Sequence, residues 1–426
     1  MNTYPHYKPS GIQWIGEIPE HWEVKKLKYI PSEEPLSFID GDWIESKDII
    51  FEEGIRYITT GNIGEGKYKE QGHSFITPET FIKLNCTEVF PGDLLISRLN
   101  NPIGRSCIIP DLGFRIVTSV DNVIFRPNES FSKLYLNFLM NNSKYYEFTE
   151  LIARGATMQR ISRGLLAEVK LPVPPLSEQT AIANYLDRKT AEIDQTIADK
   201  EALIGLYEEE KKGLINEAVT KGLNPNVPLK PSGIEWLEEI PVHWRVKRLK
   251  YLSEIKTGEK NTDDNEEEGE YPFFVRSQTI QRISTYSFDG EAILTAGDGV
   301  GVAKVFHYIN GKFDYHQRVY KISHFKEIIG KFLFHYLVNN LYKEVLKVNA
   351  KSTVDSLRLP MFQNFLVAIP PLPEQAAIVD YIETETAKIN EKMTMARQEI
   401  ELLKEFRQAL IFECVTGKVC CLEVNN

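Results

Sequence analysis

Two long stretches of the chain carry apolar residues at the spacing of an α-helix, and neither contains a proline beyond its first position. In residues 177–222 and 373–417 these positions are three, four or seven residues apart, which predicts a continuous apolar stripe along each helix. At ~1.5 Å per residue, each helix would be on the order of 60 Å long. The stripe positions are Ile182, Leu186, Ile193, Ile197, Ile204, Tyr207, Leu214 and Ala218, and then Ile378, Ile382, Ile389, Met393, Ile400, Leu403, Leu410 and Cys414.

A single amphipathic helix of this length cannot bury its stripe alone, so the two matching stripes are expected to pack against each other. An antiparallel pair is the expected arrangement. The alternative is two separate helices, each packed on its own domain. Glu178 and Glu374 favour the positive ends of these helices, and Gly222 and Gly417 are suited to close them.

Outside these helices the chain has short stretches rich in β-branched and aromatic residues, punctuated by Gly, Pro, Asn and Asp. This pattern is typical of strands. Residues 131–151 and 326–348 have apolar residues at helical spacing instead, which predicts one internal helix in each half of the chain. Each half is therefore expected to be mixed α and β. The strands are expected within residues 88–97, 115–126, 291–295, 302–308 and 318–323.

The chain contains two copies of one pattern. Residues 8–30 (KPSGIQWIGEIPEHWEVKKLKYI) and 230–252 (KPSGIEWLEEIPVHWRVKRLKYL) are identical at 16 of 23 positions, at an offset of 230 − 8 = 222. Residues 174–186 (PPLSEQTAIANYL) match residues 370–382 (PPLPEQAAIVDYI) at an offset of 370 − 174 = 196, so the second copy is shorter by roughly two dozen residues. Similar ends around dissimilar centres indicate one scaffold that serves two different targets.

The repeat predicts an α+β fold in four segments with a pseudo-twofold relation. Residues 1–176 are expected to form a first domain and residues 177–222 a long central helix. Residues 223–372 form the second domain, and residues 373–426 a second long helix with a tail. The two domains would be separated by the two long helices, packed as an antiparallel coiled coil.

Composition adds one caution and two expectations. The formal net charge of −10 opposes binding to nucleic acid, but residues 258–270 alone supply −6 of it, and binding depends on local patches. The five cysteines include no CxxC pair, so they are expected to be free thiols that hold no metal. No apolar run approaches the ~20 residues of a membrane span, and the first residues lack the apolar core of a secretory signal, so a cytoplasmic location is expected.

The combination of motifs resembles a known family. A variable domain, a PPLxEQ segment and a long helix occur twice, together with the repeated K-P-S-G-I-x-W and I-P-x-H-W motifs. This arrangement is similar to the specificity subunit of type I restriction-modification systems. The resemblance implies that each domain recognises one half of a split site in double-stranded DNA, with the paired helices as a ruler between them. It also implies two adenine methylation subunits and an endonuclease-translocase as partners, and these would hold S-adenosylmethionine, Mg and ATP.

Side chains that recognise bases are chiefly Arg, Lys, Asn and Gln, set among positive contacts to phosphate. The richest segment is residues 154–163, and a polar loop at residues 97–105 lies between two expected strands. The alternatives are a solvated hairpin for the loop and a polar connector for the segment. The expected DNA-binding residues are Arg98, Asn100, Asn101, Arg105, Arg154, Thr157, Gln159, Arg160 and Arg163 in the first copy. In the second copy they are Arg276, Gln278, Lys304, Arg318, Lys351, Thr353 and Arg358.

Aromatic and histidine residues also recur in both copies. Trp14, Trp22, Trp236 and Trp244 are expected to be core residues and not to stack on bases. His21 and His243 are expected to be structural.

The sequence favours a subunit without catalytic chemistry. An adenine methyltransferase needs an Asn/Asp-Pro-Pro-aromatic segment and a glycine-rich cofactor loop after a strand, and neither is convincing here. No P-loop and no HExxH pattern occurs. Two alternatives remain: a helical-hairpin adaptor that binds only protein, and a DNA methyltransferase with a degenerate site.

Overall fold

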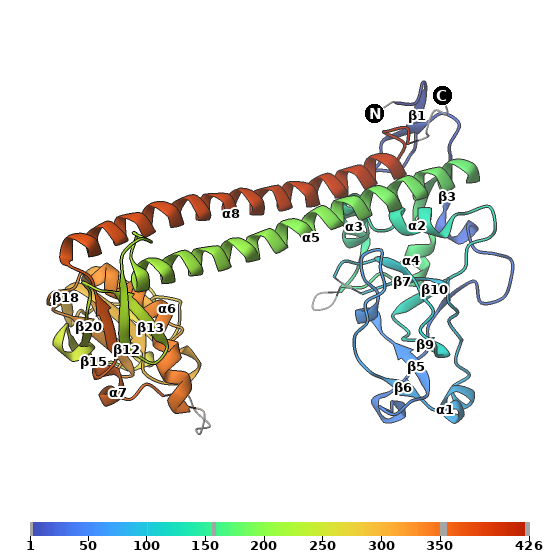
Figure 1. The fold of residues 1–426 in the computed structure, drawn as a ribbon. Helices are drawn as coiled ribbons and strands as arrows, with labels where there is room; N and C mark the ends of the chain where they lie inside the picture. Colours follow the sequence, from blue (N-terminus) through green and yellow to red (C-terminus); the bar gives the residue numbers. More distant parts are fainter. Residues whose placement is uncertain (1–2, 100, 156–158, 350–355, 422–426) are drawn as a thin grey trace. The chain divides into compact units, whose positions relative to one another are not determined.

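The computed structural model describes residues 3–99, 101–155, 159–349 and 356–421. The chain divides into two compact units, the first made of residues 1–199 with 398–426 and the second of residues 200–397. Each unit combines one mixed α/β domain with parts of both long helices (Figure 1). The units therefore divide the chain within the long helices, whereas the repeat placed segment boundaries at the helix ends.

The two long helices form where the apolar stripes predict them. Helix α5 spans Leu176–Lys221 and has 46 residues, and helix α8 spans Leu372–Val415 and has 44 residues. Each begins with an acidic residue in its first turn, where a negative charge stabilises the helix dipole. Each is followed by a glycine at positive φ, +76° for Gly222 and +71° for Gly417, a conformation that closes a helix with little strain only in glycine.

The stripes of the two helices pack together within each unit. In the first unit Ile182 and Leu186 of α5 share one buried cluster with Leu410 and Cys414 of α8. The second unit buries the end of α5 with the start of α8; its cluster contains Ile215, Ala218 and Val219 together with Ile378, Val379 and Ile382. The start of one helix thus meets the end of the other in both units, which confirms the antiparallel pair. Both clusters also include domain residues, so each helix packs on a domain as well.

The first domain is built on a four-stranded antiparallel sheet in the order β4-β10-β7-β8. A second sheet, β6-β5-β9, has one parallel pair, and two short antiparallel pairs, β1-β2 and β3-β11, complete the domain. The strands are β1 Tyr7–Pro9, β2 Glu17–Pro19, β3 Glu23–Lys26, β4 Phe38–Asp40, β5 Ile55–Ile58, β6 Phe75–Ile76, β7 Leu94–Ser97, β8 Ser106–Ile108, β9 Ile116–Thr118, β10 Asn122–Phe125 and β11 Lys170–Val173. The helices are α1 Pro78–Lys83, α2 Lys133–Leu139, α3 Ser143–Ile152 and α4 Arg163–Ala167.

The second domain repeats this sheet and extends it. Its six strands lie in the order β15-β20-β18-β19-β16-β17, whose first four members have the same pairing order as β4-β10-β7-β8. The strands are β12 Leu229–Ile234, β13 Leu237–Pro241, β14 Arg245–Arg248, β15 Glu254–Thr257, β16 Tyr271–Phe274, β17 Gln281–Ile283, β18 Phe288–Ala296, β19 Phe306–Tyr315, β20 Val319–Ser323 and β21 Leu366–Ile369. The helices are α6 Gly330–Asn349 and α7 Leu359–Gln363.

Three of the elements expected from the sequence differ from those observed. Residues 131–151 form two helices, because Asn142 leaves the helical conformation and its side chain caps α3 by accepting from the N–H of Tyr145 at 2.9 Å. Residues 115–126 form two strands in different sheets, separated by a turn in which the N–H of Asn122 donates to the Ser119 carbonyl. Residues 302–304 form a turn, and strand β19 begins only at Phe306.

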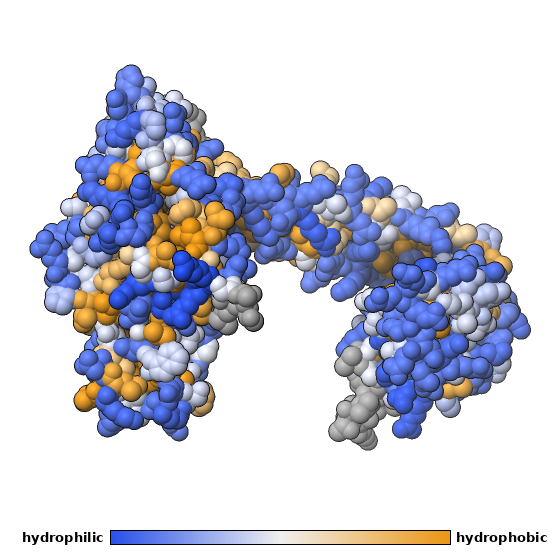
Figure 2. Space-filling view, turned by 180° about the vertical axis from the view of Figure 1, so that it is seen from behind, coloured by the Kyte–Doolittle hydropathy of each residue, from blue (hydrophilic) through white to orange (hydrophobic). Residues whose placement is uncertain are grey.

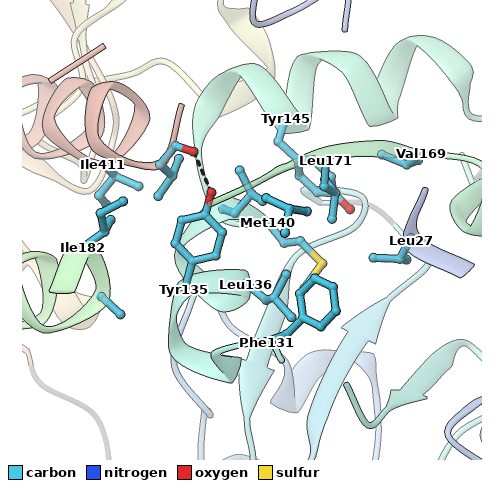
Figure 3. Packing of buried hydrophobic residues seen from close by; sticks show 14 of the residues in the cluster. Leu27, Phe131, Tyr135, Leu136, Met140, Tyr145, Val169, Leu171, Ile182 and Ile411 are labelled. Carbon is cyan, nitrogen blue, oxygen red and sulfur yellow. Dashed lines mark hydrogen bonds between the residues drawn. The ribbon is translucent and has the colours of Figure 1, made fainter. Parts of the chain in front are cut away.

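The core of the first unit joins the domain to both long helices. Tyr135 on α2 is 1% exposed and donates its hydroxyl proton to the carbonyl of Val415, the last residue of α8, at 2.9 Å (Figure 3). Ile182 of α5 and Ile411 of α8 lie beside it in the same cluster. The domain and the helix pair therefore share one hydrophobic core.

The repeated Glu-Gln of the PPLxEQ motif anchors the first turn of each long helix to its domain. Glu178 accepts from the indole Nε1 of Trp22 at 3.0 Å, and Glu374 accepts from that of Trp244 at 3.1 Å. The neighbouring His21 and His243 rings lie within 2.6 and 2.7 Å of the same carboxylates. Both tryptophans are fully buried, which confirms that they are core residues.

The glutamine of the motif makes a second, fully buried anchor. Gln179 accepts from the N–H of Ser132 at 2.9 Å and donates to the carbonyl of Pro174 at 2.9 Å. Gln375 does the same with the N–H of Ile329 and the carbonyl of Pro370. These identical contacts explain why this motif is retained in both copies while the centres of the domains differ.

Replacing Gln179 by Leu should lower the free energy of unfolding by about 1–3 kcal/mol, because the Ser132 N–H and the Pro174 carbonyl lose their buried partner. Urea unfolding of the full chain measures this. Gln195→Leu is the matched control, since Gln195 is exposed on α5 and bonds only to Asp199 among the described contacts. Equal effects of the two changes would contradict the anchor.

Candidate nucleic-acid interface

Three separate segments of the first domain meet at one junction beside its main sheet. They are the end of β7 at Arg98, the turn before β10 at Asp121, and the segment after α3. The N–H of Arg98 donates to the Asp121 carbonyl at 2.8 Å, and the N–H of Ile161 donates to the Arg98 carbonyl at 3.0 Å. Arg154 and Arg160 bond to each other through both backbone groups, at 2.9 and 2.8 Å. Backbone hydrogen bonds thus join the three segments of the junction.

The arginines of this junction surround a groove of about 720 Å³, which is lined by Arg98, Arg154, Gly155, Arg160, Ser162, Gly164 and Leu165. Nη2 of Arg160 lies 2.9 Å from Oδ1 of Asp121, and the Arg160 side chain is 43% exposed. Nε of Arg163 lies 3.7 Å from Oδ2 of Asp40, and the Arg163 side chain is also 43% exposed. Both guanidinium groups are therefore held by a carboxylate and still open to a ligand.

Arg98 and Arg105 are buried, unlike their neighbours. Arg98 donates to the Val120 carbonyl at 2.5 Å, and its Nε lies 3.2 Å from Asp40 Oδ1. Arg105 donates to the carbonyls of Ile63, Leu99, Pro102 and Thr60, at 2.6 to 2.9 Å. Burial lowers the pKa of both guanidinium groups, although from values far above neutrality. In this conformation Arg105 holds the backbone at Leu99 and Pro102 and does not present its donors to solvent.

The second domain has a junction at the equivalent place. The N–H of Gly297, after β18, donates to the Arg318 carbonyl at 2.8 Å, and the N–H of Leu357 donates to the Gly297 carbonyl at 2.9 Å. Asp298 accepts from Nη1 of Arg276 at 2.9 Å and from Nη1 of Arg318 at 2.6 Å. Burial acts to raise the pKa of Asp298, but the hydrogen bonds and charges of the two arginines outweigh it and hold that pKa below its usual value.

The two junctions share a backbone frame and differ in their side chains. Register places Ser97 of β7 opposite Asn122 of β10, and Ala296 of β18 opposite Val319 of β20. Arg98 therefore corresponds to Gly297, and Asp121 to Arg318. The same backbone hydrogen bonds hold the third segment, where Ile161 corresponds to Leu357. One scaffold thus presents two different sets of functional groups.

The acidic stretch at residues 258–270 lies beside the second junction. The N–H of Gln317 donates to the Lys260 carbonyl at 2.8 Å, and Thr262 lines a groove of about 410 Å³ together with Arg276 and Asp298. The carboxylates of this stretch are exposed, and most of the face of the second unit seen in Figure 2 is hydrophilic. The surroundings of the second junction are therefore less positive than those of the first.

Comparison with protein families decides between the interpretations that the sequence left open. A family model described as the type I restriction modification DNA specificity domain matches residues 19–202 and 241–402. The two matches contain the two junctions, and together they cover most of the chain. The chain belongs to this family. As a specificity subunit it is a DNA-recognition subunit and carries no catalysis.

Two curated relatives and two solved structures are similar over nearly the whole length of this specificity subunit, and a third relative over part of it. The MjaX (putative) and MjaIX specificity subunits of Methanocaldococcus jannaschii are 24% and 25% identical to it, and each alignment covers 95% of both chains. The EcoDI specificity subunit of Escherichia coli is 29% identical over 42% of this chain, and that match spans only 40% of the EcoDI chain.

The solved structures support the fold alone, because their sequence identity is low. The HsdS subunit from Thermoanaerobacter tengcongensis has a TM-score of 0.54 at 17% identity, with 94% of this chain and 98% of that chain covered. A chain from a study of complex assembly and conformational transition of the type I R-M system has a TM-score of 0.71 at 17% identity, with 94% and 99% covered. Both agree with two mixed domains and two long helices.

The predicted site residues of the specificity subunit fall into four groups, of which the first is the buried pair Arg98 and Arg105. Arg154, Gln159, Arg160 and Arg163 lie together at the first junction, and Arg276, Arg318 and Arg358 lie at or next to the second. Asn101 and Lys304 are exposed in neighbouring loops, and Gln278 donates to the Lys304 carbonyl at 3.0 Å. Asn100, Thr157, Lys351 and Thr353 lie outside the described residues.

The sequence did not point to three aspartates of these junctions. Asp40, Asp121 and Asp298 each lie close to a junction arginine. They were missed because a search for phosphate and base contacts selects cations and amides. One signal was available for Asp298, which lies between the expected strands at residues 291–295 and 302–308.

No helix of the described residues is both long and apolar enough to cross a membrane. Within the same residues, no three His, Cys, Asp or Glu side chains gather as ligands of a metal ion would.

Arg105→Ala should destabilise the specificity subunit by roughly 2–4 kcal/mol, since a buried charged donor is removed and its four carbonyl partners are left unsatisfied. Thermal and urea unfolding of the full chain measure this change. Arg154→Ala, an exposed arginine of the same junction, is the control and should change stability by less than about 0.5 kcal/mol. If Arg105→Ala were equally harmless, the stability of the fold would not depend on these four hydrogen bonds.

Proposed function

We propose that this specificity subunit binds a bipartite site in double-stranded DNA, with one domain for each half. The observation that supports this most directly is the repeated junction, in which one backbone frame carries different polar side chains. Two recognition surfaces of equal construction and unequal chemistry suit two half-sites of different sequence.

The proposed DNA contacts separate into positioning and base-reading groups. Arg154, Arg163 and Lys304 are exposed cations suited to phosphate. Arg160, Arg276 and Arg318 carry planar guanidinium groups that match base edges, and Gln159 and Gln278 add amides suited to adenine. Asn101 and Arg358 extend the two surfaces. Arg98 supports the first junction from beneath, because its side chain is buried.

The long helices are proposed to fix the gap between the two half-sites. Half-sites met on one face of DNA lie about one helical turn (~34 Å) apart. Helices of 46 and 44 residues are on the order of 65 Å long, enough to join two domains across that distance. The packed apolar stripe makes each helix stiffer than a flexible linker of the same number of residues.

The chemistry of the complex is proposed to lie in other subunits. Two methylation subunits would dock on this chain and use S-adenosylmethionine, and an endonuclease-translocase would use ATP and Mg. This chain would hold no cofactor of its own, and the complex would act in the cytoplasm. Sequencing of methylated adenines in cells with and without this chain tests the function, and the expected result is one bipartite motif that disappears with the gene. An unchanged methylation pattern would reject the proposal.

Replacing both Arg160 and Arg163 by Ala should weaken binding of the full complex to its target roughly tenfold or more. A guanidinium group that contacts a base contributes ~1–3 kcal/mol, and one that contacts a phosphate contributes the attraction of its charge. The dependence of log affinity on log salt should also become less steep, by about 1 for each phosphate that the variant no longer neutralises. Fluorescence anisotropy over a salt series measures both. Unchanged affinity and slope would remove the first junction from the DNA interface.

Inserting one heptad into each long helix, after residue 199 and before residue 398, should lengthen the recognised spacer by about three base pairs. Seven residues add ~10.5 Å, and one base pair is ~3.4 Å long. Sequencing of the methylated sites measures the spacer. A heptad in α5 alone is the control, since it shifts the apolar register and should abolish binding. A spacer that stays the same would mean that the helices do not set the gap.

A further inference from the structure

Carboxylates lie among the arginines of both junctions, where a DNA-binding surface would be expected to avoid them. Asp121 faces Arg160 in the first domain, and Asp298 faces Arg276 and Arg318 in the second. A negative charge here repels phosphate and weakens every non-specific contact with DNA. Affinity for DNA therefore does not explain why carboxylates lie at both junctions.

In each pair the carboxylate is the less exposed partner. The Asp121 side chain is 26% exposed against 43% for Arg160. The Asp298 side chain is 24% exposed against 41% for Arg276 and 59% for Arg318. The carboxylate thus lies beneath the guanidinium group and leaves it facing solvent. Arg98 is the opposite case, because its side chain is 6% exposed and its contacts point inward.

The pairing is kept although the residues that make it have moved. Asp121 lies in the turn before β10, whereas that position in the second domain is occupied by Arg318. The second carboxylate, Asp298, comes instead from the segment after β18, next to Gly297. The arginine–aspartate pair is therefore formed at different positions of the same backbone frame in the two domains. The combination of charges is the same in both. A pair inherited only as part of the scaffold would occupy the same positions in both copies.

An arginine held in this way is prepared for one kind of partner. A guanidinium group has five N–H donors, so one contact with a carboxylate leaves two neighbouring N–H groups free to bind another partner together. The O6 and N7 atoms of guanine in the major groove accept two such N–H groups in a bidentate pair. Because the carboxylate already orders the arginine, less side-chain entropy is lost on binding. The same carboxylate disfavours phosphate, the competing partner of any exposed arginine.

We propose that Asp121 and Asp298 are positioning residues that direct Arg160, and Arg276 with Arg318, to guanine bases, one set in each half of the DNA target. This rests on the proposed function. The aspartates do not touch DNA; they act on specificity through the arginines. Each half-site should therefore contain at least one guanine whose replacement is strongly discriminated against.

Selection from a pool of randomised duplexes by the full chain with its methylation subunits tests this. For Asp121→Asn, discrimination in favour of guanine should fall about tenfold or more at one position of one half-site. Affinity for an unrelated duplex should rise severalfold, and the other half-site should be unchanged. Asp298→Asn should produce the same two effects with the half-sites exchanged. A purely structural ion pair would alter stability without raising affinity for unrelated DNA.

Two further variants keep the result interpretable. Asp194→Asn is the matched control, because Asp194 also pairs with an arginine, Arg407 at 2.8 Å, but on the helix pair away from the junction. Arg160→Lys keeps the charge and removes the planar fork, so it should lose the same guanine preference even if Asp121→Asn does not fold.

The outcomes separate the two proposals. If the wild-type complex selects no bipartite sequence, the proposed function fails. If it selects one, but guanine discrimination survives in Asp121→Asn, Asp298→Asn and Arg160→Lys, only the positioning role is overturned.

Discussion

The burial of two long apolar stripes is the constraint on which the rest of the structure depends. Neither α5 nor α8 can remove its stripe from water alone, and at about 25 cal/mol per Å² an exposed stripe of this length would cost many kcal/mol. Each unit solves the problem with the start of one helix and the end of the other. Because Leu410 and Trp22 belong to the same buried cluster, the domain core and the helix pair fold as one body within the unit. A domain cannot lose its helices without exposing its own core.

The anchors at the helix starts decide which parts of the sequence are free to change. Glu178 and Gln179 are bound by a tryptophan indole, a histidine and backbone groups, and the second copy repeats every one of these contacts. These residues must keep both shape and hydrogen-bonding capacity. The junctions, in contrast, are held by backbone hydrogen bonds that nearly any side chain permits. Exposed side chains at the junctions can therefore change without loss of the fold.

The features predicted from the sequence are those that repeat at a fixed period. Spacing and residue type alone were enough to predict the apolar stripes, the helix ends at Gly222 and Gly417, and the duplication. The break at Asn142 was not predicted, because one side-chain cap interrupts a helical pattern whose apolar period continues across it. Burial of Arg105 was equally hidden, since two of its four carbonyl partners, Thr60 and Ile63, are 45 and 42 residues away and reach it only in the folded chain. The aspartates of the junctions were missed for the same reason: a pair such as Asp121 and Arg160 exists only after folding.

The net charge of −10 argues less strongly against DNA recognition when the positions of the charges in the structure are considered. At the first junction, Arg98 after β7 and Arg154 and Arg160 after α3 line one groove, so their positive charges act together there. The carboxylates of residues 258–270 are concentrated beside the second junction instead. An acidic border weakens attraction to phosphate in general, but it leaves the geometry of a guanidinium fork intact. Under the proposed function, the second domain would therefore depend more on shape and hydrogen bonding than on charge, and the two domains would recognise DNA with different balances of the same forces.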